Sequence, residues 1–377
     1  MNIVKHEHKK IITSPSLIGF VITCILLNIL LVFSARNSYA DYIAEVSYKT
    51  GVRMGAEFDR QVENLTPSEY SVWLQMQTEG ITDVFDDYNA KLIGEAYVNA
   101  FNLYGIIANL MVDKYERLQT VVERNTKTGV GMDLYFAGAT YDRHTQLFRV
   151  IMTVLLFEGI LLISLTMLLS LGHEFNTKTE FTVYATKTGR RVNRAKLISC
   201  ILTGLLIYIF LSIVTLLFFF LINPLGAIGG SSVSSGFNYV HDLVAGVRPF
   251  ITWFDLNVIG YVIATVCASA GVILCFGILS YITGLWIRNG YIGFLIIALI
   301  NFAIFVLPFT ILGTTLPTYF LTLSPIWIVL QQGVWFTDGG SNVLLPHFEI
   351  VGIIASLVIL APIATLSSSR FKRKNLV

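Results

Sequence analysis

The chain has 377 residues, of which 54% are hydrophobic and only 13% are charged, and its formal net charge is +2. Soluble domains carry about 25% charged residues, and a soluble core has no room for this much apolar surface. The composition therefore excludes an ordinary soluble protein. It predicts a chain embedded in a lipid bilayer, and we expect no nucleic-acid partner.

Six apolar stretches approach or exceed the roughly 20 residues that a helix needs to cross the hydrocarbon core. We therefore predict an all-α polytopic membrane protein with six transmembrane helices and a mostly helical extracellular domain between the first and second. The stretches are Ile11–Phe33 (interrupted by Ser14-Pro15-Ser16), Val150–Leu171, Leu197–Ile222, Val258–Ile287, Tyr291–Leu312 and Ile350–Leu366. The fourth is long enough that it must tilt, project or break, with Gly271 and Gly277 as candidate break points.

Lysine and arginine gather in the segments that would share one face of the membrane: the N-terminus, residues 172–196, Arg288 and the C-terminal tail. Cytoplasmic loops carry such an excess. We expect a multi-pass protein of the cell membrane with both termini in the cytoplasm. Residues 1–35 then form the N-terminus and first span, 36–147 the extracellular domain, and 148–377 a five-helix transmembrane region.

Ser38-Tyr39-Ala40 resembles a signal-peptidase site that follows an apolar run. Because the run is longer than the usual core of a signal peptide, we favour a retained anchor. Cleavage would leave the orientation of the other spans unchanged.

Two patterns in the extracellular region predict helices. Thr66-Pro67-Ser68-Glu69 is a typical helix start. A longer helix is expected over about 95–124 and ends before Gly129, with a stripe that packs on a neighbouring helix, forms a seam with a second chain or meets a partner or cargo. The stripe comprises Phe101, Tyr104, Ala108, Met111, Tyr115, Leu118 and Val122, with Asp113, Lys114, Glu116 and Arg117 off it.

The sequence carries no recognisable catalytic motif. It has no phosphate-cradling Gly-x-x-x-x-Gly-Lys-[Ser/Thr] and no metal-ligand spacing of His, Cys, Asp or Glu; His173-Glu174 lacks the second histidine of a zinc helix. We expect no metal site and no enzyme activity in this chain. Glu158 is an acidic residue well inside the second span, and it reads either as a hydrogen-bonded packing residue or as a cargo contact or proton-sensitive site.

Residues 172–196 mix apolar and basic side chains, a pattern that suits an amphipathic helix on the inner membrane surface. An acidic residue after the second span, a short helix, a glycine break, basic residues and a lysine that opens the third span follow one another. These positions are Glu174, residues 179–185, Gly189, Arg190, Arg191, Arg194 and Lys196. In this layout the chain resembles ABC-2-type exporter permeases. It departs from many members in having Thr188-Gly189 where they have a small residue and proline.

The resemblance implies that 172–196 is the coupling segment, which docks on a cytoplasmic ABC ATPase subunit. Apolar docking would come from Phe175, Phe181 and Tyr184, and charge complementarity from Arg190 and Arg191, with Glu174 and Arg194 in the same segment. ATP and magnesium would be bound by that partner, so no cofactor is expected here. A second permease subunit, identical or paralogous, would complete the complex. Residues 313–347, with Pro317 and Pro325, would form paired short helices that dip back into the membrane.

The expected function is export of a hydrophobic or amphipathic substrate such as a peptide, a lipid-linked molecule or a drug. The alternatives are a membrane-anchored sensor or scaffold that uses the extracellular domain, and an ion-coupled carrier. The sequence does not identify the cargo.

Overall fold

The computed structural model describes residues 2–34, 66, 68–69, 72, 76, 83–132, 145–185, 189, 192–223, 230–235, 238–287 and 289–373. Within them, six helices are long and apolar enough to cross a membrane, as expected. The chain is therefore a mostly helical, polytopic membrane protein. The spans are Pro15–Ser34, Gln146–Asn176, Val192–Ile222, Val258–Trp286, Gly290–Thr310 and Phe348–Phe371.

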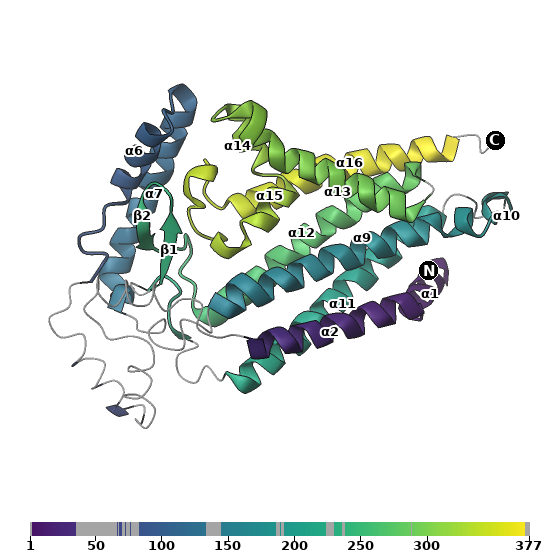
Figure 1. Ribbon diagram of the computed structural model, residues 1–377, viewed down its shortest axis with the longest axis horizontal. Helices are drawn as coiled ribbons and strands as arrows, with labels where there is room; N and C mark the ends of the chain where they lie inside the picture. The colour runs from purple at the N-terminus through teal and green to yellow at the C-terminus, as the bar shows by residue number, and fades with distance from the viewer. Residues whose placement is uncertain are drawn as a thin grey trace.

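Figure 1 labels these spans by their helices. They are α2 (Pro15–Ser34), α9 (Met152–Asn176, preceded by a π-helical turn Gln146–Ile151), α11 (Val192–Ile222), α12 (Val258–Trp286), α13 (Gly290–Leu307, followed by a π-helical turn Pro308–Leu312) and α16 (Phe348–Arg373). Helix α9 is central and packs against α12, α11, α13 and α2. In its most apolar stretch 61% of the residues are buried, against 17% for α2.

Helix α12 crosses the bundle without a break, so Gly271 and Gly277 do not interrupt it. Both lie where another helix approaches closely. A Cβ atom on Gly277 would lie 2.7 Å from Ile163 Cδ1, and one on Gly271 would lie 2.9 Å from Ile353 Cγ2. Small residues at such contacts allow membrane helices to pack tightly. The glycines therefore serve packing rather than bending.

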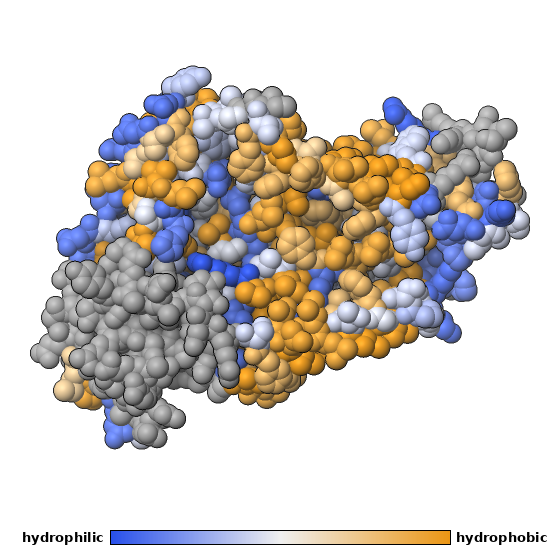
Figure 2. Space-filling view, in the orientation of Figure 1, coloured by the Kyte–Doolittle hydropathy of each residue, from blue (hydrophilic) through white to orange (hydrophobic). Residues whose placement is uncertain are grey.

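The bundle has two different ends. Both chain termini and the short helix α10 (Glu180–Ala185) lie at one end, which we call the terminal end, and helices α6 and α7 lie at the other, the domain end (Figure 1). Figure 2 shows hydrophobic residues covering the long helices between them, while hydrophilic residues gather at the two ends. This distribution is what a bilayer around the middle of the bundle requires.

Helix α1 (Asn2–Ile12) is separated from α2 by a break at Thr13 and Ser14. It packs along α11, where Ser199 donates a 2.9 Å hydrogen bond to the carbonyl of Val4. The first apolar run thus forms one span, and an amphipathic helix at the terminal end precedes it. Residues 38–40, the cleavage motif considered above, lie outside the described residues.

At the domain end, the long helix expected over 95–124 is in fact two helices, α6 (Ala90–Ala100) and α7 (Gly105–Thr128). The chain turns between them at Asn102, whose φ is 48°. Gly129, with φ of 68°, caps α7 in the left-handed conformation, as expected for a helix that ends there. The Thr66 backbone N–H donates to Glu69 at 2.8 Å, which confirms the predicted helix start.

The stripe on α7 is buried from Met111 to Val122, within this chain, but Tyr104 is 83% exposed and lies outside it. The core around the stripe is not supplied by α6 and α7 alone. Trp253, Tyr319 and Leu344, from two distant segments, belong to the same hydrophobic cluster. The described part of 36–147 is therefore one of three chain segments that together form a composite domain.

The second segment contains the antiparallel hairpin of β1 (Tyr239–Asp242) and β2 (Gly246–Pro249), which lies between α11 and α12. The third contains α14 (Leu316–Leu321), α15 (Pro325–Leu330) and two 3₁₀ turns, Gln332–Val334 and Gly340–Asn342. Proline in the first turn starts both α14 and α15, since its fixed φ suits that position. The short helices in 313–347 agree with expectation, and their depth in a bilayer stays a prediction.

A final 3₁₀ turn, Val130–Met132, follows α7 in the first segment.

Candidate functional site

Helix α9 ends abruptly at the terminal end. Lys178 adopts a left-handed φ of 55°, and the N–H of Thr179 donates to the carbonyl of Glu174 at 2.9 Å. This is the hydrogen-bond pattern of a Schellman turn, which stops a helix and redirects the chain. The next residues form α10, which projects beyond the long helices (Figure 1).

Glu174 does not face the solvent. It is 5% exposed and pairs with Lys196, which is fully buried and also donates to the carbonyl of Ser170. The ion pair joins the end of α9 to the start of α11. Both charges are satisfied within the bundle, so Glu174 braces the two helices on either side of α10 instead of offering a free charge.

The other residues predicted for docking are distributed unevenly. Phe181 is 64% exposed on α10, and Arg194 is exposed on the first turn of α11. Tyr184 is half-buried, because its ring packs edge-on against Phe371 of α16 at 5.8 Å and against Phe175 at 6.2 Å. Arg190 and Arg191 lie outside the described residues. Of the predicted set, Phe181 is therefore the apolar side chain presented outward.

A second polar group lies inside the bundle, around Glu158 of α9. Asn28 of α2 donates from its amide nitrogen to Glu158 Oε2 at 3.0 Å and to Thr215 Oγ1 of α11 at 3.1 Å. All three side chains are at least 95% buried. The residues thus connect three spans, and we call them the intramembrane cluster. Of these residues only Glu158 was expected to have a special role, although Asn28, as a polar residue within an apolar span, carries the same kind of signal.

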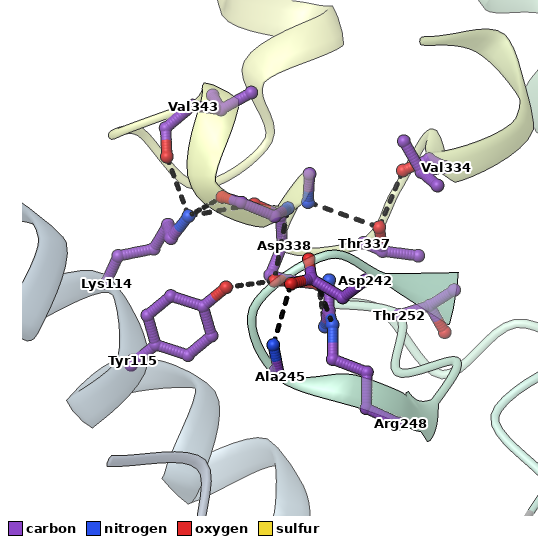
Figure 3. Close-up of polar contacts among 12 residues, drawn as sticks. Lys114, Tyr115, Asp242, Ala245, Arg248, Thr252, Val334, Thr337, Asp338 and Val343 are labelled. Atoms are coloured by element: carbon purple, nitrogen blue, oxygen red, sulfur yellow. Dashed lines mark hydrogen bonds and ion pairs between the residues drawn. The ribbon is translucent and has the colours of Figure 1, made fainter. Parts of the chain in front are cut away.

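A third polar group fastens the domain end (Figure 3). Lys114 of α7 is 1% exposed and donates hydrogen bonds to three carbonyl oxygens, those of Asp338, Gly340 and Val343, at 3.1, 2.7 and 2.6 Å. Arg248 of β2 pairs with Asp338 at 2.7 Å, and the Tyr115 hydroxyl donates to the same carboxylate. We call these residues the domain-end cluster. Lys114 lies off the apolar stripe of α7, as expected, but it is buried all the same, because its acceptors come from a loop more than 220 positions away.

The electrostatics of the domain-end cluster follow from burial. Burial, assisted by Arg248 and opposed by Asp338, lowers the pKa of Lys114 to about 7. Burial also disfavours the Asp338 carboxylate, but the cations of Arg248 and Lys114 outweigh that effect and hold its pKa below the usual range. The carboxylate therefore stays ionised at neutral pH. The hydrogen bonds and the ion pair of the cluster hold three segments of the chain together.

Among the cavities that border the membrane-spanning helices, two lie away from the terminal end and are almost wholly apolar. One of about 340 Å³ lies between α9, α12, α13 and α15, and its polar lining groups are Ser164 and Asn301. Another of about 180 Å³ lies between α2 and α11 beside Asn28 and Thr215. Within the described ranges, no group of three or more His, Cys, Asp or Glu side chains is placed to hold a metal ion.

Comparison of the chain with protein-family models, with curated proteins and with solved structures finds no match. Its function has therefore to be inferred from its own residues. What the described residues establish is a polytopic membrane protein with six helices able to span a bilayer, a projecting helix at one end of the bundle, a buried polar cluster inside it and a composite domain at the other end.

Proposed function

We propose that this chain is the membrane-spanning permease subunit of an ABC-2-type exporter. In this proposal the terminal end is cytoplasmic, and α10 binds to a separate ATPase subunit, which itself binds ATP and magnesium. The observation that carries the proposal is the position of Phe181, an exposed aromatic side chain on a short helix that projects between two spans. Exposed aromatic residues of this kind serve as anchors in protein interfaces.

The construction of α10 supports a coupling role. A docking helix transmits force only if it is attached firmly to the elements that must move. Helix α10 follows directly from α9, and the Glu174–Lys196 pair joins α9 to α11 just beneath it. The contact between Tyr184 and Phe371 also attaches α10 to α16. A displacement of α10 would therefore act on three spans together.

The charge distribution supports the same orientation. Lysine and arginine are concentrated in segments that meet at the terminal end, and such segments stay in the cytoplasm. The apolar cavity between α9, α12, α13 and α15 suits a hydrophobic or amphipathic cargo better than an inorganic ion. A second permease subunit and two ATPase subunits would complete the transporter.

The direct test is co-purification of the tagged full-length chain with the ATPase subunit encoded nearest to it, using wild-type protein and Phe181→Asp. The substitution removes an aromatic anchor that would become buried on docking and puts a charge in its place, so it should weaken binding by at least about tenfold. Tyr104→Asp is the matched control, because Tyr104 is an exposed aromatic residue at the domain end.

Equal recovery of the ATPase with wild-type and Phe181→Asp protein would contradict the docking assignment. If the chain were a sensor, a scaffold or an ion-coupled carrier, no ATPase would co-purify with the wild-type protein. Loss of binding with Tyr104→Asp would mean that the assay reports folding rather than docking.

A further inference from the structure

The intramembrane cluster has more hydrogen-bond acceptors than donors. Asn28 uses its amide nitrogen for Glu158 and Thr215, while its carbonyl oxygen Oδ1 has no hydrogen-bond partner among the described residues. In the described part of the chain Glu158 Oε1 likewise has no conventional partner, although the weakly donating thiol of Cys24 lies beside the carboxylate. Buried acceptors of this kind are costly unless a donor satisfies them.

The charge of Glu158 is also uncompensated. Among the described residues, the ion pairs join Lys196 to Glu174 and Arg248 to Asp242 and Asp338, and none involves Glu158. The hydrogen bond from Asn28 holds the carboxylate in place without neutralising it. A cation or a proton is therefore needed to balance it in a low-dielectric interior.

The cluster borders an apolar slot that opens beside α2. The cavity of about 180 Å³ has Asn28 and Thr215 as its polar lining groups, with walls that include Ile25, Ile29, Phe218 and Leu221. Asn28 is 1% exposed, so its unpartnered oxygen belongs to a buried side chain that lines the slot. Helix α2 is the least buried span, which places the slot next to lipid.

The depth of the cluster restricts what reaches it. Glu158 lies twelve residues after Gln146, where its span begins, which corresponds to about 18 Å along a helix. The hydrocarbon core is about 30 Å thick, so the carboxylate lies well inside it. A phospholipid headgroup stays at the interface, whereas a single-chain amphipathic molecule can bring a small polar group to this level.

We infer that the slot between α2 and α11 binds an amphipathic molecule with a protonated amino group. Its N–H donors pair with Asn28 Oδ1, which lines the slot, its positive charge balances the Glu158 carboxylate that Asn28 holds in place, and its hydrocarbon chain lies against Ile25, Ile29 and Phe218. For the proposed exporter, such amines would be a class of cargo. Only this last step, from ligand to cargo, rests on the proposed function.

Binding is measured on the purified full-length chain in nanodiscs of phosphatidylcholine, without ATP or an ATPase subunit. The probes are n-dodecylamine, n-dodecyltrimethylammonium, which is cationic but has no N–H donor, and n-dodecanol, which is neutral. We expect wild-type protein to bind dodecylamine at least tenfold more tightly than either analogue. Nanodiscs that also contain phosphatidylethanolamine test the lipid source, and we expect them to leave the affinity for dodecylamine unchanged.

Glu158→Gln keeps the shape of the side chain and its bond from Asn28 but removes the charge. We expect it to lower the affinity for dodecylamine at least tenfold and to leave that for dodecanol unchanged. Ser164→Ala is the control, because Ser164 lies on the same helix but lines the other cavity. Equal binding of dodecylamine and dodecanol by wild-type protein would overturn the inference and show that a proton alone balances Glu158. Equal affinity of Glu158→Gln and wild-type protein for dodecylamine would overturn it as well. Because the assay contains no motor, its failure leaves the docking of α10 untouched, and failure of docking leaves this assay informative.

Discussion

The Nζ atom of Lys114 lies 2.6 Å from the carbonyl oxygen of Val343, so a hydrogen bond joins residues that are 229 positions apart. Lys114 belongs to α7, and Val343 lies five residues before α16 begins. With its two other carbonyl acceptors, the lysine fixes the loop that leads into the last span. The domain end is therefore attached to the membrane bundle by the hydrogen bonds of a buried lysine as well as by its apolar core.

Replacing Lys114 with methionine should destabilise this attachment strongly. Three carbonyl groups would lose their donor, and the Asp338 carboxylate would lose one of its two cations; breaking a buried charged network of this kind costs about 3–5 kcal/mol. Urea titration of the protein in nanodiscs, followed by tryptophan fluorescence, measures the change. Lys91→Met, an exposed lysine on α6, serves as the control and should change stability by less than about 0.5 kcal/mol. A Lys114→Met midpoint equal to that of Lys91→Met would contradict the assignment.

The same lysine predicts how stability changes with pH. Its pKa is about 7 in the folded protein, whereas an unfolded lysine titrates near 10.4. Between these values the unfolded chain binds more protons than the folded chain, so the stability of the domain end should rise as pH increases. We expect the urea midpoint of the wild type to rise from pH 7 to pH 9, below the range in which unfolded tyrosines ionise. Lys114→Met should lack most of this rise, and parallel pH profiles of the two proteins would contradict the role of Lys114.

The Asp338 carboxylate does not add to this trend. Its pKa is lowered in the folded state, so its contribution is fully present above the ordinary range near pH 4 and is lost only as pH falls below it. The difference between the pH profiles of wild-type protein and Lys114→Met from pH 7 to pH 9 therefore reports the lysine.

The membrane-spanning part of the fold follows from local sequence. Runs of about 20 apolar residues have few alternatives to a helix in lipid, which is why all six spans were predicted within a few residues of their observed ends. The proline-initiated helices α14 and α15 and the glycine cap of α7 also depend on local chemistry. The break at Asn102 was missed because nothing in the apolar spacing around it signals a left-handed residue.

The polar clusters could not be predicted in the same way, because their partners come from distant segments. Lys114 looks like a surface residue on its own helix, and only the loop at Asp338 makes it a buried one. Glu158 was recognisable as an unusual residue, but its contact with Asn28 depends on how α2 docks against α9. A single sequence gives the identity of such residues but not their pairing.

The brace at the terminal end can be tested by a double-mutant cycle. Lys196→Met alone would leave the buried Glu174 carboxylate without its partner and should cost about 3–5 kcal/mol. Lys196→Met combined with Glu174→Gln removes both charges and should recover a large part of that loss. Urea titration in nanodiscs gives the interaction energy, with Lys9→Met as an exposed control on α1. Additive effects of the two substitutions would mean that the pair does not hold α9 to α11.

The orientation of the chain can be determined with a membrane-impermeant maleimide. Thr182 is exposed on α10 and Tyr104 is exposed before α7, at opposite ends of the bundle. The background is low, because Cys24, Cys200 and Cys275 are buried and Cys267 lies within a span and can be replaced by alanine. We expect Tyr104→Cys to be labelled on intact cells and Thr182→Cys to be labelled only after the cells are permeabilised.

This result decides whether a cytoplasmic motor can reach α10 at all. The basic segments predict that the terminal end faces the cytoplasm, since lysine and arginine near span ends are retained there. Labelling of Thr182→Cys on intact cells would place α10 outside and remove the physical basis for its docking on an ATPase. The intramembrane cluster would be unaffected by that reversal, because Asn28, Glu158 and Thr215 lie within the spans and a ligand can approach them laterally from lipid in either orientation.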